Sequence, residues 1–363
     1  MGIIRGSIRS SKKLAMAAGL LLLGLAVACG SSSSSNGGGD ASSKLVPQRA
    51  TVVGSLASDQ ALEAINLNVD QFLDMLSSQS GGQCEKFVEF LTVEQFQPGG
   101  LFGNITRVDV FGEVTDGDDL GYLGAVLHGS FDEPAFIATL EEVSGEKLAK
   151  KTYKDQNVYS PVDSEEEFDL SVLNDSLFAL GTGGAINDII DIKVGDAASA
   201  SGPLIDTFDS LADGLFALAV KMPENFGEDS DLGEVPGLGD LPISLDFMSS
   251  LNIIGLNGTL DGTALDVKVT LDFSDEEAAE SLEGFISGLV SLASGFVADP
   301  ETSGLLESLD VERDAGLLTV KVSVPLADIP GLFEDFTSVS SVESSTDGAL
   351  QPGTPEISLI PAA

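Results

Sequence analysis

Hydrophobic residues recur along this chain with two different spacings, and the order of these spacings predicts its folded elements. Every second residue from Leu265 to Phe273 is apolar, which predicts a strand with one buried face. The preceding segment, 252–260, also predicts a strand. The dipeptide Asp261-Gly262 between the two is typical of a hairpin turn.

A helix is predicted directly after this hairpin, over residues 275–297. Apolar side chains recur there at every third or fourth position, from Ala278 to Phe296, as on the buried face of a helix. Ser274 and Glu277 have the spacing of a capping box, in which each side chain binds a free backbone N–H of the first turn.

The same order of strand, turn, strand and helix is predicted nearer the N-terminus. Residues 108–114 and 121–131 predict two strands, and the acidic segment 116–119 predicts the turn between them. Asp132 is a suitable helix N-cap, and Pro134 suits the first turn of the helix that follows.

Further elements precede, follow and separate these two units. Strands are predicted over 46–56, 147–154, 156–162, 168–180, 214–221, 305–313 and 317–325. Helices are predicted over 58–78, 84–96, 184–193, 203–212 and 326–336.

These elements predict an α+β fold with two related halves, 46–222 and 247–336. Each half is expected to form a twisted antiparallel sheet with helices packed on one face. The acidic, Pro- and Gly-rich segment 223–246 is expected to link the halves, and 337–363 to be a disordered tail. The repeated unit suggests gene duplication as a hypothesis.

The N-terminal segment has the organisation of an export signal. Basic residues precede a 15-residue apolar run, Leu14 to Ala28, which is shorter than the about 20 residues that a membrane-spanning helix needs. Small residues then precede Cys29 and a run of serines. The basic residues are Arg5, Arg9, Lys12 and Lys13.

In these features residues 1–35 resemble a bacterial lipoprotein precursor. The resemblance implies that 1–28 are removed, that Cys29 is lipidated, and that the protein is anchored by lipid outside the cytoplasmic membrane. Residues 29–45 would then be the lipidated cysteine and a flexible Gly/Ser tether. An ordinary cleaved signal and an uncleaved anchor are the alternatives.

Two short motifs in the remaining chain loosely resemble uncharacterised exported proteins. One is Val46-Pro47 followed by Ala50-Thr51-Val52-Val53-Gly54, and the other is Gly129-Ser130-Phe131-Asp132. This resemblance implies a fold of the kind described above and no known activity.

The charge of the chain restricts its partners. It has 58 acidic and 17 basic residues, and four of the basic ones lie within residues 1–28, which leaves a formal charge of −45 beyond them. Direct binding of nucleic acid or of anionic lipid headgroups is therefore not expected, because phosphate binding depends on basic patches. The acidity suits either solubility in saline surroundings or the collection of Ca²⁺ or cationic partners.

Two acidic clusters are candidate Ca²⁺ sites, although neither has the spacing of a calcium-binding loop. Solvated turns are the simpler interpretation of both, and neither cluster leads us to expect a metal cofactor. The candidates are Asp116, Asp118 and Asp119 in a hairpin turn, and Glu228, Asp229, Asp231 and Glu234 in the linker.

The residues needed for common enzyme chemistry are scarce. His128 is the only histidine, and Cys84 is the only cysteine besides Cys29, which argues against ordinary zinc sites and His-Cys catalysis. We expect His128 to be a surface or packed residue and Cys84 to be buried and inert, with a reactive thiol or intermolecular disulfide as the alternative. Paired carboxylates such as Glu165-Glu166-Glu167 are uninformative in so acidic a chain.

Two groups of glycines also have alternative interpretations. Gly181-Thr182-Gly183-Gly184 lies where a phosphate-binding loop could precede a helix, but its spacing favours a tight turn. Gly284, Gly288 and Gly295 lie along the long helix 275–297. They suggest close packing of that helix on the sheet, or a helix that separates from the sheet to expose an apolar cleft.

The sequence therefore favours a non-enzymatic, lipid-anchored extracytoplasmic protein with a binding or structural role. Its partners would be the membrane, through the N-terminal lipid, and a protein or an apolar ligand. The first alternative is a carrier or sensor of an apolar or lipid-like ligand held between sheet and helices. A hydrolase of unrecognised type is a weaker alternative, and no cofactor is expected.

Overall fold

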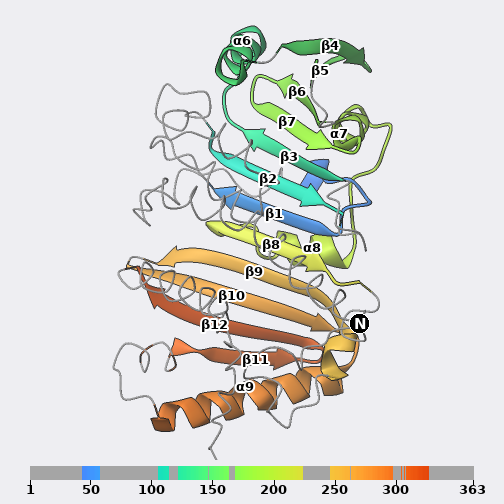
Figure 1. Cartoon of the computed structure of the whole chain (residues 1–363). Coiled ribbons are helices and arrows are strands. Elements are labelled where there is room, and N and C mark those ends of the chain that lie inside the picture. Colours follow the sequence, from blue (N-terminus) through green and yellow to red (C-terminus); the bar gives the residue numbers. More distant parts are fainter. Residues whose placement is uncertain are drawn as a thin grey trace, which may run out of the picture.

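One antiparallel sheet runs through the whole described part of the computed structural model (Figure 1). The structure describes residues 43–57, 105–113, 122–145, 147–162, 168–223, 246–261, 263–296, 304, 306 and 308–326. Within these residues the sheet has twelve strands, in the spatial order β11-β12-β10-β9-β8-β1-β2-β3-β7-β6-β5-β4.

The strands and helices have the following bounds. The strands are β1 Val52–Ala57, β2 Arg107–Gly112, β3 Leu123–His128, β4 Leu148–Tyr153, β5 Gln156–Pro161, β6 Phe168–Asn174, β7 Leu177–Thr182, β8 Phe216–Lys221, β9 Leu251–Asp261, β10 Ala264–Phe273, β11 Asp310–Asp314 and β12 Leu317–Pro325. The α-helices are α6 Glu133–Ser144, α7 Ala185–Val194, α8 Pro203–Asp209 and α9 Glu276–Phe296, and the 3₁₀-helices are η1 Ser43–Leu45 and η3 Asp246–Ser250.

The predicted α+β class is confirmed, but the prediction of a separate sheet in each half is wrong. Strand β1 pairs with β2 on one side and with β8 on the other, and β8 pairs in turn with β9. Hydrogen bonds therefore continue across the boundary between the predicted halves. β1 suits this central place because five of its six residues are buried, so that both of its faces are covered.

Each predicted half nevertheless has a similar strand order. In the first, the hairpin β2–β3 is followed by α6, and β7 returns to pair with β3. In the second, the hairpin β9–β10 is followed by α9, and β12 returns to pair with β10. The first half additionally contains β1, β4, β5 and β8, and the origin of the two halves by duplication stays a prediction.

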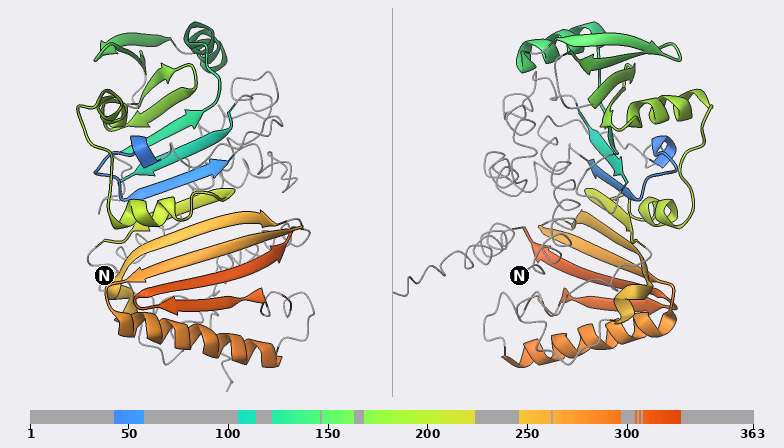
Figure 2. Two further views of the ribbon diagram at one scale, coloured as in Figure 1. Left: turned by 180° about the vertical axis from the view of Figure 1, so that it is seen from behind. Right: turned by 45° about the vertical axis from the view of Figure 1, so that its right-hand side comes forward.

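Helices cover both faces of the sheet, contrary to the expectation of one covered face (Figure 2). Helices α7 and α8 pack on the face that presents Val53 and Phe111. Helix α6 packs on the opposite face, against Val108, Leu127 and Phe178. Helix α9 lies on the same side as α6, at the other end of the sheet. Both faces of the sheet thus contribute residues to the hydrophobic core.

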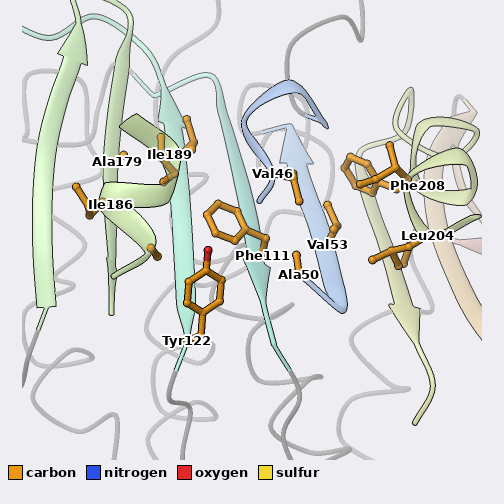
Figure 3. Close-up of a cluster of buried hydrophobic side chains, with 14 of the residues drawn as sticks. Val46, Ala50, Val53, Phe111, Tyr122, Ala179, Ile186, Ile189, Leu204 and Phe208 are labelled. Carbon is orange, nitrogen blue, oxygen red and sulfur yellow. The ribbon is translucent and has the colours of Figure 1, made fainter. Parts of the chain in front are cut away.

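The core beneath α7 and α8 is the larger of the buried clusters (Figure 3). Ile186 and Ile189 of α7 and Phe208 of α8 are fully buried there. They pack over Phe111 of β2 and Val53 of β1. Removal of these aliphatic and aromatic surfaces from water is the main stabilising contribution of this side.

Most predicted helices occur where expected, with one correction to the capping. The side chain of Asp132 accepts a hydrogen bond from the backbone N–H of Ala135 at 2.9 Å, which confirms the N-cap of α6. At α9 the predicted capping box does not form. Ser274 donates to the carbonyl of Ser250, and Asp275 accepts from the N–H of Glu277 at 3.1 Å instead.

Three predicted strands needed revision. The segment 168–180 forms a hairpin, β6 and β7, because the side chain of Asn174 accepts from the backbone N–H of Ser176 and stabilises a turn. β1 begins only at Val52, and β11 only at Asp310. The predicted helices over 58–78, 84–96 and 326–336, and most of the linker 223–246, lie outside the described residues.

Candidate functional site

An apolar depression lies over the middle of the sheet, on the face opposite to α7 and α8. Its cavity volume is about 20 Å³, and the space around this cavity opens to solvent. Its walls come from the neighbouring strands β8, β1, β2 and β3, and almost all of the exposed lining is apolar. The residues that line it on this face are Val52, Gly54, Leu56, Val108, Val110, Gly112, Leu123, Phe216 and Leu218.

Two glycines create the hollow. Gly54 lies between Val110 and Leu218 in register, and Gly112 lies between Val52 and Leu123. A methyl group added at Gly54 would lie 3.1 Å from a methyl of Val110, so this space is open only because position 54 has no side chain. The strand periodicity of the sequence did not reveal the hollow, because it needs the register of four strands.

The apolar surface continues from the depression toward β12. Leu256, Val267, Val269 and Val320 are half-buried and belong to neither of the clusters that α6 and α9 form with the sheet. Among the described residues, no helix is placed over this middle part of the face. An extended apolar surface of this kind is typical of a binding site.

A charged cluster lies on the opposite face, at the ends of β2 and β3. The carboxylate of Asp109, whose side chain is 3% exposed, lies 2.6 Å from Nε2 of His128 and accepts from Nε of Arg107 at 2.7 Å. His128 is thus packed in an ion-pair cluster, in agreement with the expectation of a surface or packed residue.

Three tyrosines donate hydrogen bonds to carboxylates around the sheet. The hydroxyl of Tyr122 donates to Asp188 at 2.8 Å, and the guanidinium of Arg49 lies 3.8 Å from the ring centre. Burial and the Asp188 carboxylate raise the pKa of Tyr122 well above its ordinary value. Burial and Glu133 raise the pKa of Tyr159 to about 12, and a hydrogen bond to Asp191 raises the pKa of Tyr153.

These raised values predict a loss of stability at alkaline pH. Because a raised pKa in the folded state contributes stability below the ordinary pKa of tyrosine, about 10, that contribution is lost as pH rises through the folded value. The chain has three tyrosines and no tryptophan, so absorbance at 295 nm reports these phenols alone. We expect their ionisation to start above pH 10 and to accompany unfolding, followed by circular dichroism.

Tyr122→Phe supplies the control for this titration. It removes one phenol and its charged hydrogen bond, and is expected to cost about 1.5–3 kcal/mol at neutral pH. Ionisation of all three phenols near pH 10 without any unfolding would contradict the prediction.

Most sequence-predicted site residues lie outside the described residues. These are Cys29, Cys84, Asp116, Asp118, Asp119, Glu165, Glu166, Glu167, Glu228, Asp229, Asp231 and Glu234. The lipidation of Cys29 and the Ca²⁺ candidates therefore stay predictions. Within the described part of the chain, no group of three or more His, Cys, Asp or Glu side chains is arranged to hold a metal ion.

For the residues that it describes, the structure decides between the alternative interpretations of each glycine group. Gly183 and Gly184 adopt positive φ angles of 59° and 86°, which confirms a tight turn between β7 and α7. Gly284 and Gly288 have open space where a side chain would begin. The expectation of close packing through these two positions of α9 is therefore wrong.

Sequence reasoning missed Asp109 as the partner of His128, and Asp188 as the partner of Tyr122. The apolar alternation of Val108, Val110 and Gly112 predicted a strand but did not indicate that Asp109, between them, is buried. The two-sided burial of β2, at positions from Val108 to Gly112, is the reason for this error. No described helix has both the length and the apolar character that crossing a membrane requires.

Comparisons with known proteins give no family assignment. No protein-family model matches the chain, and no curated protein matches it. Among solved structures, crystal form III of TP0453 has a TM-score of 0.47 and 13% sequence identity, over 81% of this chain and 97% of that one. Crystal form I has a TM-score of 0.45 and 12% identity, over 81% and 96%. Crystal form IV has a TM-score of 0.44 and 13% identity, over 82% and 99%.

Proposed function

We propose that this chain is a non-enzymatic, lipid-anchored extracytoplasmic protein that binds an elongated apolar ligand on the face of its central strands opposite to α7 and α8. The observation that carries the proposal is the depression around Gly54, with its apolar lining and the half-buried apolar residues that extend it. The N-terminal segment supports the location, through its basic residues, short apolar run and Cys29.

The chemistry of the depression favours a lipid-like chain over a polar substrate. Val110, Leu218 and Phe216 offer van der Waals contacts, and the lining has little exposed polar surface to orient a polar group. Transfer of a methylene group from water to such a surface is worth about 0.8 kcal/mol. A ligand with several methylene groups would therefore be held without specific hydrogen bonds.

Filling the hollow is expected to abolish this binding. Gly54→Leu places a side chain in the depression, and the affinity for the neutral apolar probe N-phenyl-1-naphthylamine should fall at least tenfold. Gly288→Leu is the matched control, because position 288 of α9 is open to solvent and lies outside the depression. Probe fluorescence would be measured on the mature chain with Cys29→Ser, with thermal unfolding to establish that both variants are folded.

Native mass spectrometry of the same mature chain, purified from its own host, supplies the second test. Co-purified lipid that is present with Gly288→Leu and lost with Gly54→Leu is the expected result. A mass without ligand, together with equal probe binding by both variants, would contradict the proposed function.

A further inference from the structure

The strand β4 forms one end of the sheet, and no described strand pairs with its outer edge. It is the last strand in the spatial order, and within the described residues only β5 pairs with it. Ala149, Lys150, Lys151 and Thr152 are all exposed. At the other end, α9 runs beside β11, and Arg313 of β11 binds Glu283 of α9 at 2.8 Å (Figure 1).

The register of β4 identifies which of its backbone groups face outward. The N–H of Val162 donates to the carbonyl of Lys147, so positions 147 and 162 form a hydrogen-bonded pair at the end of the ladder. Because such pairs alternate, the groups of 149, 151 and 153 face β5, whereas those of 148, 150 and 152 face outward. By this alternation, Leu148 and Pro161 lie opposite each other without hydrogen bonds between them, which agrees with the absence of an N–H on Pro161.

One outward group is already used. The N–H of Leu148 donates to Oε1 of Glu141 in α6 at 2.9 Å, which confirms the outward direction of this position. For the outward N–H and C=O groups of Lys150 and Thr152, the described residues supply no partner. They are the groups that an additional strand would bind.

The side chains of this edge are basic in a strongly acidic protein. Four of the thirteen basic residues beyond position 28 lie within 147–154, namely Lys147, Lys150, Lys151 and Lys154. The ammonium group of Lys150 lies 3.9 Å from Glu133, and that of Lys151 lies 3.0 Å from Asp169. Both lysine side chains are about half exposed, so these ion pairs are weak, and an incoming carboxylate can replace them.

From these observations we infer that β4 binds an extended acidic segment of another protein as an additional strand. The outward groups of Lys150 and Thr152 supply the backbone hydrogen bonds. Lys150 and Lys151 point to opposite faces of the sheet, so each selects an acidic residue of the added strand. This inference goes beyond the proposed function, because it uses a surface at the end of the sheet and a partner of different chemistry.

The same lysines disfavour a second copy of β4 as the occupant. An antiparallel pairing centred on Lys150 places two Lys150 side chains directly opposite each other, and a pairing centred on Lys151 does the same with Lys151. Like charges at such positions are destabilising. The lysines thus disfavour pairing with a second copy of β4 and favour pairing with an acidic strand.

A proline at position 152 tests the strand geometry. Thr152→Pro removes an outward N–H and leaves the hydrogen bonds to β5 intact, and proline is tolerated on edge strands. Thr152→Ala is the matched control because it keeps the N–H. Lys150→Glu tests the charge, and Lys221→Glu, at an exposed lysine of β8, is its control.

The probe is the rhodamine-labelled six-residue peptide TVEEVT, compared with TVKKVT by fluorescence anisotropy on the mature chain with Cys29→Ser. At 0.15 M salt the Debye length is about 8 Å, so the local lysines act on the peptide while the distant acidic residues are screened. We expect TVEEVT to bind at least tenfold more tightly than TVKKVT. Thr152→Pro and Lys150→Glu should each weaken TVEEVT binding at least tenfold, with changes of less than twofold in both controls.

Two results would overturn the inference. One is equal binding of both peptides, or binding of TVEEVT that Thr152→Pro leaves unchanged while thermal unfolding shows the variant to be folded. The other is a dimer in sedimentation experiments that Thr152→Pro dissociates, which would assign the edge to a second copy of the chain.

Discussion

Replacement of Asp109 by alanine is expected to lower the free energy of unfolding by about 3–5 kcal/mol. The carboxylate is almost fully buried and holds both Arg107 and His128 at hydrogen-bond distance. Its removal leaves a cavity and takes a buried acceptor from both of these side chains. Removal of one partner from a buried pair costs more than the pair itself contributes.

Urea denaturation of the variant and of two controls would measure this effect. Lys151→Ala breaks an exposed ion pair and should cost no more than about 1 kcal/mol. Replacing Asp109, Arg107 and His128 together by leucine should restore much of the stability, because no buried charge then remains. A loss below 1 kcal/mol for Asp109→Ala would show that the cluster is solvated in solution.

Phe111→Ala is expected to cost a similar amount, about 3–5 kcal/mol. The ring is 1% exposed and lies over Gly124, its direct cross-strand neighbour in β3. A methyl group added at Gly124 would lie 2.3 Å from this ring, so Gly124→Ala alone forces the ring to move and should cost about 1–3 kcal/mol.

The two substitutions are expected to be strongly non-additive. Once Phe111 is alanine, the space above position 124 is empty, and Gly124→Ala becomes neutral or stabilising. A double-mutant cycle by chemical denaturation should therefore give a coupling of about 1–3 kcal/mol. Additive effects within about 0.5 kcal/mol would contradict the packing of the ring on the glycine.

Local signals in the sequence were sufficient for individual elements. The alternation from Leu265 to Phe273 predicted β10, and Asp132 with Pro134 predicted the start of α6. These predictions succeeded because the period of apolar residues and the capping chemistry act over a few neighbouring positions. Helix boundaries were accordingly within a few residues for α7 and α9.

The arrangement of these elements could not be predicted in the same way. Pairing of β8 with β9 joins the two predicted sheets, and pairing of β1 with β8 brings together residues far apart in the sequence. Two features of the candidate sites depend on the register of neighbouring strands in the same way. They are the contact of Asp109 with His128 and the hollow at Gly54. Periodicity specifies which face of a strand is apolar, but not which strand lies next to it.

The central place of β1 has a consequence for the order in which the chain can fold. Val52 pairs with Val220, so β1 forms one of its two pairings only with a strand that is synthesised long after it. Until β8 has been synthesised, β1 cannot form this pairing. β8 in turn can pair with β9 only after β9 has been synthesised. Closing such long loops slows folding because their entropy is lost before the contacts form. Because a chain is synthesised with its N-terminus first, the middle of the sheet is therefore completed only after most of the protein has been made.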